Sequence, residues 1–185
     1  MSELPKRKQS RLKDYDYSKN GYYFITICTH RRQMLFGIID DGKIKLNDIG
    51  NIVDFTWNDL INHNDIKLHQ YVIMPDHMHG IIEICDCRRE RSVTVPKEFK
   101  VNCKKAIKHS GIPEVIRQFK TFSSKRINEF LKRNGYEPFP TGKLWQKSYF
   151  EHIIRDENDY ITKAQYILNN SLDPEYDHID YYKNF

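Results

Sequence analysis

The fold is decided by Lys67-Leu-His-Gln-Tyr-Val-Ile-Met-Pro-Asp-His-Met-His-Gly-Ile-Ile-Glu-Ile-Cys85. Both halves of this stretch have the apolar and alternating patterns of β-strands. The Pro75-Asp76 break between them leaves room only for a tight connection. We therefore predict a strand from Lys67 to Met74 and a second from His77 to Cys85, paired as a hairpin.

The second strand of this hairpin begins with two histidines. Side chains alternate across a strand, so His77 and His79 project from one face of the sheet, and Met78 and Gly80 project from the other. Two imidazoles on one face can share a divalent metal ion, although buried histidines can also be purely structural. Imidazole suits several metals, so the pair leaves the metal open and requires a third ligand.

Patterns elsewhere predict the remaining elements. Aromatic and β-branched residues indicate a strand at Gly21 to Thr29, and helical periodicity indicates a helix from Asn47 to Asn62. The others are a long helix from Pro113 to Asn134, a strand from Leu144 to Arg155, and a last helix from Asp156 to about Asn170. This order predicts an α+β fold, a ferredoxin-like βαββαβ antiparallel sheet with an added C-terminal helix.

Length and composition predict a single domain spanning residues 1–185. Residues 1–20 form a basic N-terminal arm, and the charged, aperiodic stretch 86–112 is expected to be a mobile insertion. The sequence shows neither an apolar run of about 20 residues nor a signal peptide, which favours a cytoplasmic protein without a membrane partner. The pair Cys85 and Cys87 is a weaker zinc candidate, because no second pair follows at the usual spacing.

The formal net charge of +5 permits a polyanionic partner without requiring one. Basic side chains cluster at the N-terminus, after the first strand and on the long helix, where solvated charge is the alternative interpretation. The candidate phosphate contacts are Lys6, Arg7, Lys8, Arg11, Arg31, Arg32, Lys120, Lys125 and Arg126. Aromatic candidates for stacking on unpaired bases, with core packing as the alternative, are Trp145, Tyr149 and Tyr160.

The last helix offers a partner for the histidines. Tyr166 and Asn170 are four residues apart, so a phenol and an amide lie on one helical face, about 6 Å apart along the axis. The alternative is that Tyr166 packs in the core and that Asn170 ends the helix. Spacing alone does not decide between the two.

Several motifs together resemble those of the REP-associated tyrosine transposases, which belong to the HUH single-strand endonucleases. The resemblance runs from Arg11 to about Asn170. It rests on the segments Tyr23-Phe-Ile-Thr-Ile-Cys-Thr29, Tyr71-Val-Ile-Met-Pro-Asp-His-Met-His-Gly80, Phe119-Lys-Thr-Phe122, Leu144-Trp-Gln-Lys-Ser-Tyr-Phe-Glu-His152 and Ile153-Ile-Arg-Asp-Glu157. The combination is far more specific than two histidines alone.

The resemblance implies roles for individual residues. His77 and His79 become ligands of Mg²⁺ or Mn²⁺, Tyr166 the nucleophile and Asn170 the third ligand, with Asn169 as an alternative third ligand. His152 resembles a family histidine that partners a metal ligand or contacts DNA, with a packed or solvent-facing histidine as the alternative. Glu83 shares the strand parity of His77 and His79, so it is either a partner of a ligand or an exposed strand residue.

The implied activity is metal-dependent nicking and rejoining of single-stranded DNA, flanked by a hairpin, through a covalent 5′-phosphotyrosine. A replication-initiator nickase uses the same chemistry. A catalytically silent module that binds single-stranded nucleic acid is the alternative from another class. The sequence leaves open a monomer or a homodimer, with Tyr166 acting in its own subunit or its partner's.

Overall fold

The computed structural model describes residues 16–85, 111–140 and 143–172. The basic arm at residues 1–15, most of the expected insertion, and Cys87 lie outside the described residues, so the contacts predicted for Lys6, Arg7, Lys8 and Arg11 stay predictions. Among the described helices, none is long and apolar enough to cross a membrane.

The core of the fold is a four-stranded antiparallel sheet. Its strands are β1 (Gly21–Cys28), β4 (Ile66–Met74), β5 (His77–Ile84) and β6 (Phe150–Ile154), in the order β4-β5-β1-β6. β1 and β5 hold the centre, which agrees with their near-continuous apolar sequences. The order and orientation confirm the predicted ferredoxin-like arrangement.

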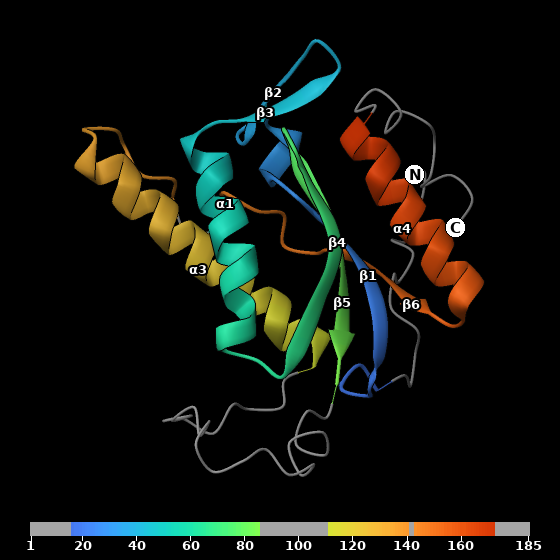
Figure 1. Cartoon of the computed structure of the whole chain (residues 1–185). Coiled ribbons are helices and arrows are strands. Elements are labelled where there is room, and N and C mark those ends of the chain that lie inside the picture. The colour runs from blue at the N-terminus through green and yellow to red at the C-terminus, as the bar shows by residue number, and fades with distance from the viewer. Residues whose placement is uncertain (1–15, 86–110, 141–142, 173–185) are drawn as a thin grey trace, which may run out of the picture.

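Helices cover both faces of the sheet (Figure 1). α1 (Asp48–Asp59) and α3 (Ile112–Arg133) lie on one face, and α4 (Glu157–Leu172) lies alone on the other. The larger hydrophobic core, centred on Trp57 and Phe119, fills the first interface, and a smaller cluster around Phe24 and Ile167 fills the second. Of the described helices, the added C-terminal helix is therefore the one that covers this face of the sheet.

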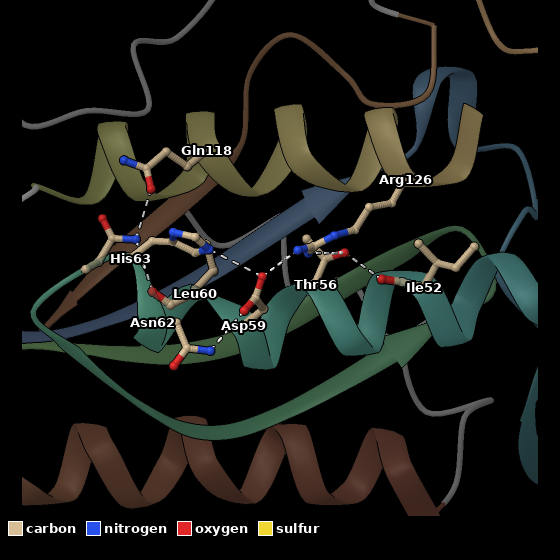
Figure 2. A network of polar contacts seen from close by, with 9 residues as sticks. Ile52, Thr56, Asp59, Leu60, Asn62, His63, Gln118 and Arg126 are labelled. Carbon is tan, nitrogen blue, oxygen red and sulfur yellow. Dashed lines mark hydrogen bonds and ion pairs between the residues drawn. The ribbon is translucent and has the colours of Figure 1, made fainter. Parts of the chain in front are cut away.

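Polar contacts join the two helices of the first face (Figure 2). Arg126 of α3 donates to the Asp59 carboxylate at 2.5 Å and to the Thr56 hydroxyl at 3.2 Å, and Gln118 accepts from Asn64 at 3.0 Å. Asn47 caps α1, and its side-chain oxygen accepts from the Gly50 amide at 2.9 Å. These contacts fix α1 against α3 on the side away from the histidine pair.

Two predictions about the strands were wrong. A small hairpin, β2 (Gly37–Asp40) with β3 (Lys43–Leu46), precedes α1, and the sequence prediction omitted it. The fourth strand is shorter than the predicted stretch from Leu144. Trp145 still pairs with Thr29 in an isolated bridge, and the continuous ladder begins only at Phe150. Between them, carbonyl groups of 146–148 accept hydrogen bonds from the Lys120 ammonium.

Candidate metal and nucleophile site

The two histidines meet on the α4 face of the sheet, as strand alternation predicted. Nε2 of His77 lies 3.1 Å from Nε2 of His79, and each side chain is almost completely buried. Two ligands about 2.1 Å from one octahedral ion lie about 3.0 Å apart, so the observed spacing fits a shared ion without rearrangement. Among the described residues, no group of three His, Cys, Asp or Glu side chains gathers.

Each histidine has a partner for its other ring nitrogen. Asp76 places a carboxylate oxygen 2.6 Å from Nδ1 of His77, and the Thr26 hydroxyl lies 2.8 Å from Nδ1 of His79. If Nδ1 carries the proton in both rings, two Nε2 lone pairs converge at 3.1 Å, an arrangement that a cation between them stabilises. The local hydrogen bonds therefore prepare both Nε2 atoms as ligands.

Arg32 holds Asp76, the hydrogen-bond partner of His77. Its Nε lies 2.8 Å from the second carboxylate oxygen of Asp76, and its terminal nitrogen lies 3.1 Å from the Cys28 sulfur. Arg31 and Arg32 both adopt positive φ angles, 58° and 56°, which are uncommon for residues with a side chain. Arg32 thus orients Asp76, a role that sequence reasoning missed because it assigned both arginines to DNA alone.

α4 brings Tyr166 to the pair. Its hydroxyl lies 3.4 Å from Nε2 of His79, its ring meets the His79 ring edge to face at 5.1 Å, and the side chain is 7% exposed. Phe24 stacks on the His79 ring at 5.5 Å and meets the Tyr166 ring at 6.0 Å, so the three rings contact one another and fix the imidazole plane. The phenol predicted as the nucleophile is therefore next to the predicted metal ligands.

Asn170 lies one turn beyond Tyr166 on the buried side of α4. It is fully buried, and neither its amide oxygen nor its amide nitrogen has a hydrogen-bond partner in the structure. A buried amide without partners costs about 1–3 kcal/mol, so its retention calls for a ligand such as an ion or water. Asn169, the alternative third ligand, is only half-buried, which favours Asn170.

A buried cation also lies on this face of α4. Lys163 is 3% exposed, and its ammonium lies 5.5 Å from the centre of the Phe24 ring, the same ring that stacks on His79.

Burial raises the pKa of the Asp159 carboxyl, but hydrogen bonds from His152 and from the Arg155 amide, with the charge of Lys163, outweigh it and hold that pKa below its ordinary value. The prediction did not include Lys163, whose helical spacing from Tyr166 was the available signal.

Two residues expected beside the site have partners of their own. Glu83 accepts from His69 at 3.0 Å and pairs with Lys67, two same-face positions beyond His79 along β5. His152 lies opposite Phe24 and contacts the Asp159 carboxylate at 2.8 Å. These contacts tie Glu83 to β4 and His152 to α4, and their expected role as partners of the metal ligands stays a prediction.

The predicted DNA contacts on α3 have protein partners. The Lys120 ammonium binds the 146–148 carbonyl groups, and Arg126 binds Asp59, so these side chains join structural elements here. Trp145 is in the core, where its ring nitrogen donates to Ser123 at 2.9 Å, so the stacking interpretation of Trp145 was wrong. The DNA contacts of Lys120, Arg126, Arg31 and Arg32 stay predictions.

Comparison with known proteins identifies sequence relatives of this chain. No model of a known protein family matches the chain. An uncharacterised protein of Haemophilus influenzae is 35% identical over 171 residues, 90% of this chain and 88% of the relative. A putative REP-associated tyrosine transposase of the same organism is 22% identical over 157 residues, 85% of this chain and 73% of the relative.

A solved structure supports the same relationship at the level of fold. A REP-associated tyrosine transposase bound to a REP hairpin matches with a TM-score of 0.52 and 19% identity, over 88% of this chain and 72% of that chain. The chain therefore belongs to one family with the uncharacterised Haemophilus influenzae protein, and it resembles the REP-associated tyrosine transposases in sequence and in fold.

Proposed function

We propose that this chain is a metal-dependent single-stranded DNA endonuclease and strand transferase, with Tyr166 as its nucleophile. The proposal rests above all on one contact: the Tyr166 hydroxyl lies 3.4 Å from Nε2 of His79. That nitrogen lies 3.1 Å from Nε2 of His77. The buried amide of Asn170 on the same helix would complete a donor set of two imidazoles and one amide oxygen, which would suit Mg²⁺ or Mn²⁺. The resemblance to transposases supplies DNA as the substrate class.

The side chains divide the work as follows. A bound Mg²⁺ or Mn²⁺ would supply positive charge to a non-bridging oxygen of the scissile phosphate. α4 presents the Tyr166 oxygen to phosphorus for in-line attack. The bond from that oxygen to phosphorus forms, the bond from phosphorus to the 3′ oxygen breaks, the phenolic proton is released, and the 3′ oxygen leaves as a hydroxyl. Attack by a 3′ hydroxyl reverses these bonds and rejoins the strand.

The protein scaffold contributes orientation and charge. Thr26, Asp76 and Phe24 fix the two imidazoles, so little reorganisation is needed when a phosphate arrives. Lys163 adds a buried positive charge on the Tyr166 face of α4, which favours an anionic substrate. The phosphotyrosine conserves the energy of the broken phosphodiester, so rejoining requires no nucleotide cofactor.

A covalent-adduct assay tests the proposal. The protein is incubated with 5′- and 3′-labelled hairpin DNA carrying single-stranded tails, with Mn²⁺, Mg²⁺ or EDTA, and resolved on a denaturing gel. We expect a metal-dependent adduct with the 3′-side fragment, lost in Tyr166→Phe and retained in Tyr160→Phe. Binding without an adduct under any metal condition would instead identify a silent nucleic-acid-binding module, and loss only in Tyr160→Phe would move the nucleophile.

A further inference from the structure

A cavity opens at the far end of the interface between α4 and the sheet. It has a volume of about 530 Å³ and is lined by Tyr22 of β1, His69 of β4, Tyr160 of α4 and the turn 154–157 that joins β6 to α4. This volume falls within the usual range of small-molecule sites, about 300–1,000 Å³. The cavity shares its sheet face with the histidine pair, and Tyr160 precedes Tyr166 by about 9 Å along the helix axis.

Three rings shape the cavity by contacting one another edge to face. The ring centres of Tyr22 and His69 are 5.3 Å apart, those of Tyr22 and Tyr160 are 5.4 Å apart, and those of His69 and Tyr160 are 5.8 Å apart. Such a cluster leaves ring faces on which a flat ligand can stack, and Tyr22 remains 36% exposed.

Hydrogen bonds hold this cluster in place. The two ring nitrogens of His69 lie 3.0 Å from a Glu83 carboxylate oxygen and 3.1 Å from the Tyr160 hydroxyl, and that hydroxyl also donates to Gln70 at 2.9 Å. The polar edges of His69 and Tyr160 are thus occupied by protein groups. What remains for a ligand is the aromatic surface and the charged rim.

Hydrogen-bond acceptors at the rim of the cavity determine which ligands fit it. Asp156 and Glu157 present exposed carboxylates at the cavity, and Arg155 presents the single cation of the lining turn. Carboxylates repel a phosphate but accept hydrogen bonds from an exocyclic amino group of a base. A bare phosphate is therefore disfavoured inside, whereas an amino-bearing base suits both the aromatic surface and the rim.

We propose that this cavity holds one unpaired nucleobase with an amino edge, from the same strand whose phosphate meets Tyr166. This inference rests on the proposed function, because the base belongs to the DNA strand that Tyr166 would attack. The cavity and the histidine pair share one face of the sheet, so one strand can reach both. Cytosine and thymine form the sharpest comparison, since both are small pyrimidines but only cytosine carries an exocyclic amino group.

The test measures binding rather than cleavage. Full-length protein carrying Tyr166→Phe is titrated in EDTA with fluorescein-labelled dC12 and dT12, which have the same backbone charge. We expect dC12 to bind more tightly. Tyr160→Ala should weaken dC12 binding about 5-fold or more, the smallest effect of losing one stacked base, and should bring the two affinities together.

Matched variants separate the contributions. Glu157→Gln should reduce the preference for dC12 while keeping the rings, because an amide can also pair with thymine. Tyr136→Ala removes a tyrosine that is 64% exposed and outside the cavity lining, so it should leave both affinities unchanged. Tyr160→Phe keeps the ring and removes the hydroxyl, so it should retain most binding and show that the ring carries the effect of Tyr160→Ala.

Equal affinities for dC12 and dT12 in the parent, or an unchanged ratio in Tyr160→Ala, would overturn the base site. The adduct assay and the binding assay have independent outcomes. An adduct without a base preference would support the proposed enzyme and contradict the base site. A Tyr160-dependent preference without any adduct would support the base site and contradict the proposed enzyme.

Discussion

The hydroxyl oxygen of Tyr166, on the last helix, lies 3.4 Å from Nε2 of His79, a residue 87 positions earlier on a central strand. Neither residue is exposed, and both pack against Phe24. A tyrosine in a core of this kind would ordinarily serve packing. In the proposed function, its contact with His79 places the nucleophile beside the metal ligands.

Asp76 should control metal affinity. It holds Nδ1 of His77 at 2.6 Å and is itself held by Arg32. We expect Asp76→Ala to weaken Mn²⁺ binding about 10- to 100-fold by calorimetry without DNA, because partners of ligating histidines have effects of this size. Arg32→Ala should have a smaller effect in the same direction, and Arg31→Ala, which changes its exposed neighbour, should have none. Equal effects of the two arginine variants would contradict the role given to Arg32.

Asn170 should affect stability and metal binding with opposite signs. Its amide is buried without hydrogen-bond partners, so Asn170→Leu removes a polar group whose burial costs about 1–3 kcal/mol. In EDTA we expect the melting temperature of Asn170→Leu to equal or exceed that of the wild type. In Mn²⁺ the wild type should gain stability, and the variant should gain much less.

Asn169→Leu is the control, because it changes the half-buried neighbour. A variant at Asn170 that loses stability in EDTA but keeps the full Mn²⁺ increment would show that the amide is structural and not a ligand.

Gly80 is required by packing rather than by chemistry. A Cβ at this position would lie 2.5 Å from Cζ2 of Trp57, a rigid ring in the core. We expect Gly80→Ala to lower the free energy of unfolding by about 1–3 kcal/mol in urea titrations. Trp57→Phe removes the atom that clashes, so the double variant should lose less than the sum of the single losses. Strict additivity would show that the contact does not limit this position.

Acid stability should depend on Asp59. A hydrogen bond from Asn62 and then the neighbouring Arg126 lower its pKa below the ordinary value, against the opposing effect of burial. A carboxyl whose pKa is lowered in the folded state stabilises it above the unfolded pKa, near 4, and loses this contribution as the pH falls through the folded pKa. Between pH 6 and pH 3, Asp59→Asn should therefore lose less unfolding free energy than the wild type; parallel losses would contradict this.

The sequence predicted those parts of the site that depend on local periodicity. Alternation across one strand placed His77 and His79 on a common face, and helical spacing placed Tyr166 and Asn170 together. Arg32 and Asp76 are separated by 44 positions and meet only because β1 and β5 pair, so spacing could not reveal their contact.

Two errors about strands have separate causes. The β2–β3 hairpin has strands of four residues with mostly exposed side chains, which weakens the burial pattern. Its signal was the Asp41-Gly42 turn, where both residues have positive φ, as two-residue hairpins prefer. The overlong fourth strand followed from aromatic content. The interruption between the Thr29–Trp145 bridge and Phe150, where Lys120 binds the carbonyl groups of 146–148, is not visible in sequence.

The most direct measurement of the central claim is the position of the DNA on the protein. The Mn²⁺-dependent adduct is digested with protease and nuclease, and mass spectrometry locates the remaining nucleotide. We predict a 5′-phosphate linkage on Tyr166 and none on Tyr160, although both tyrosines lie on the same helix. A nucleotide on any other residue, or a full yield of adduct from Tyr166→Phe, would contradict the assignment of Tyr166 as the nucleophile.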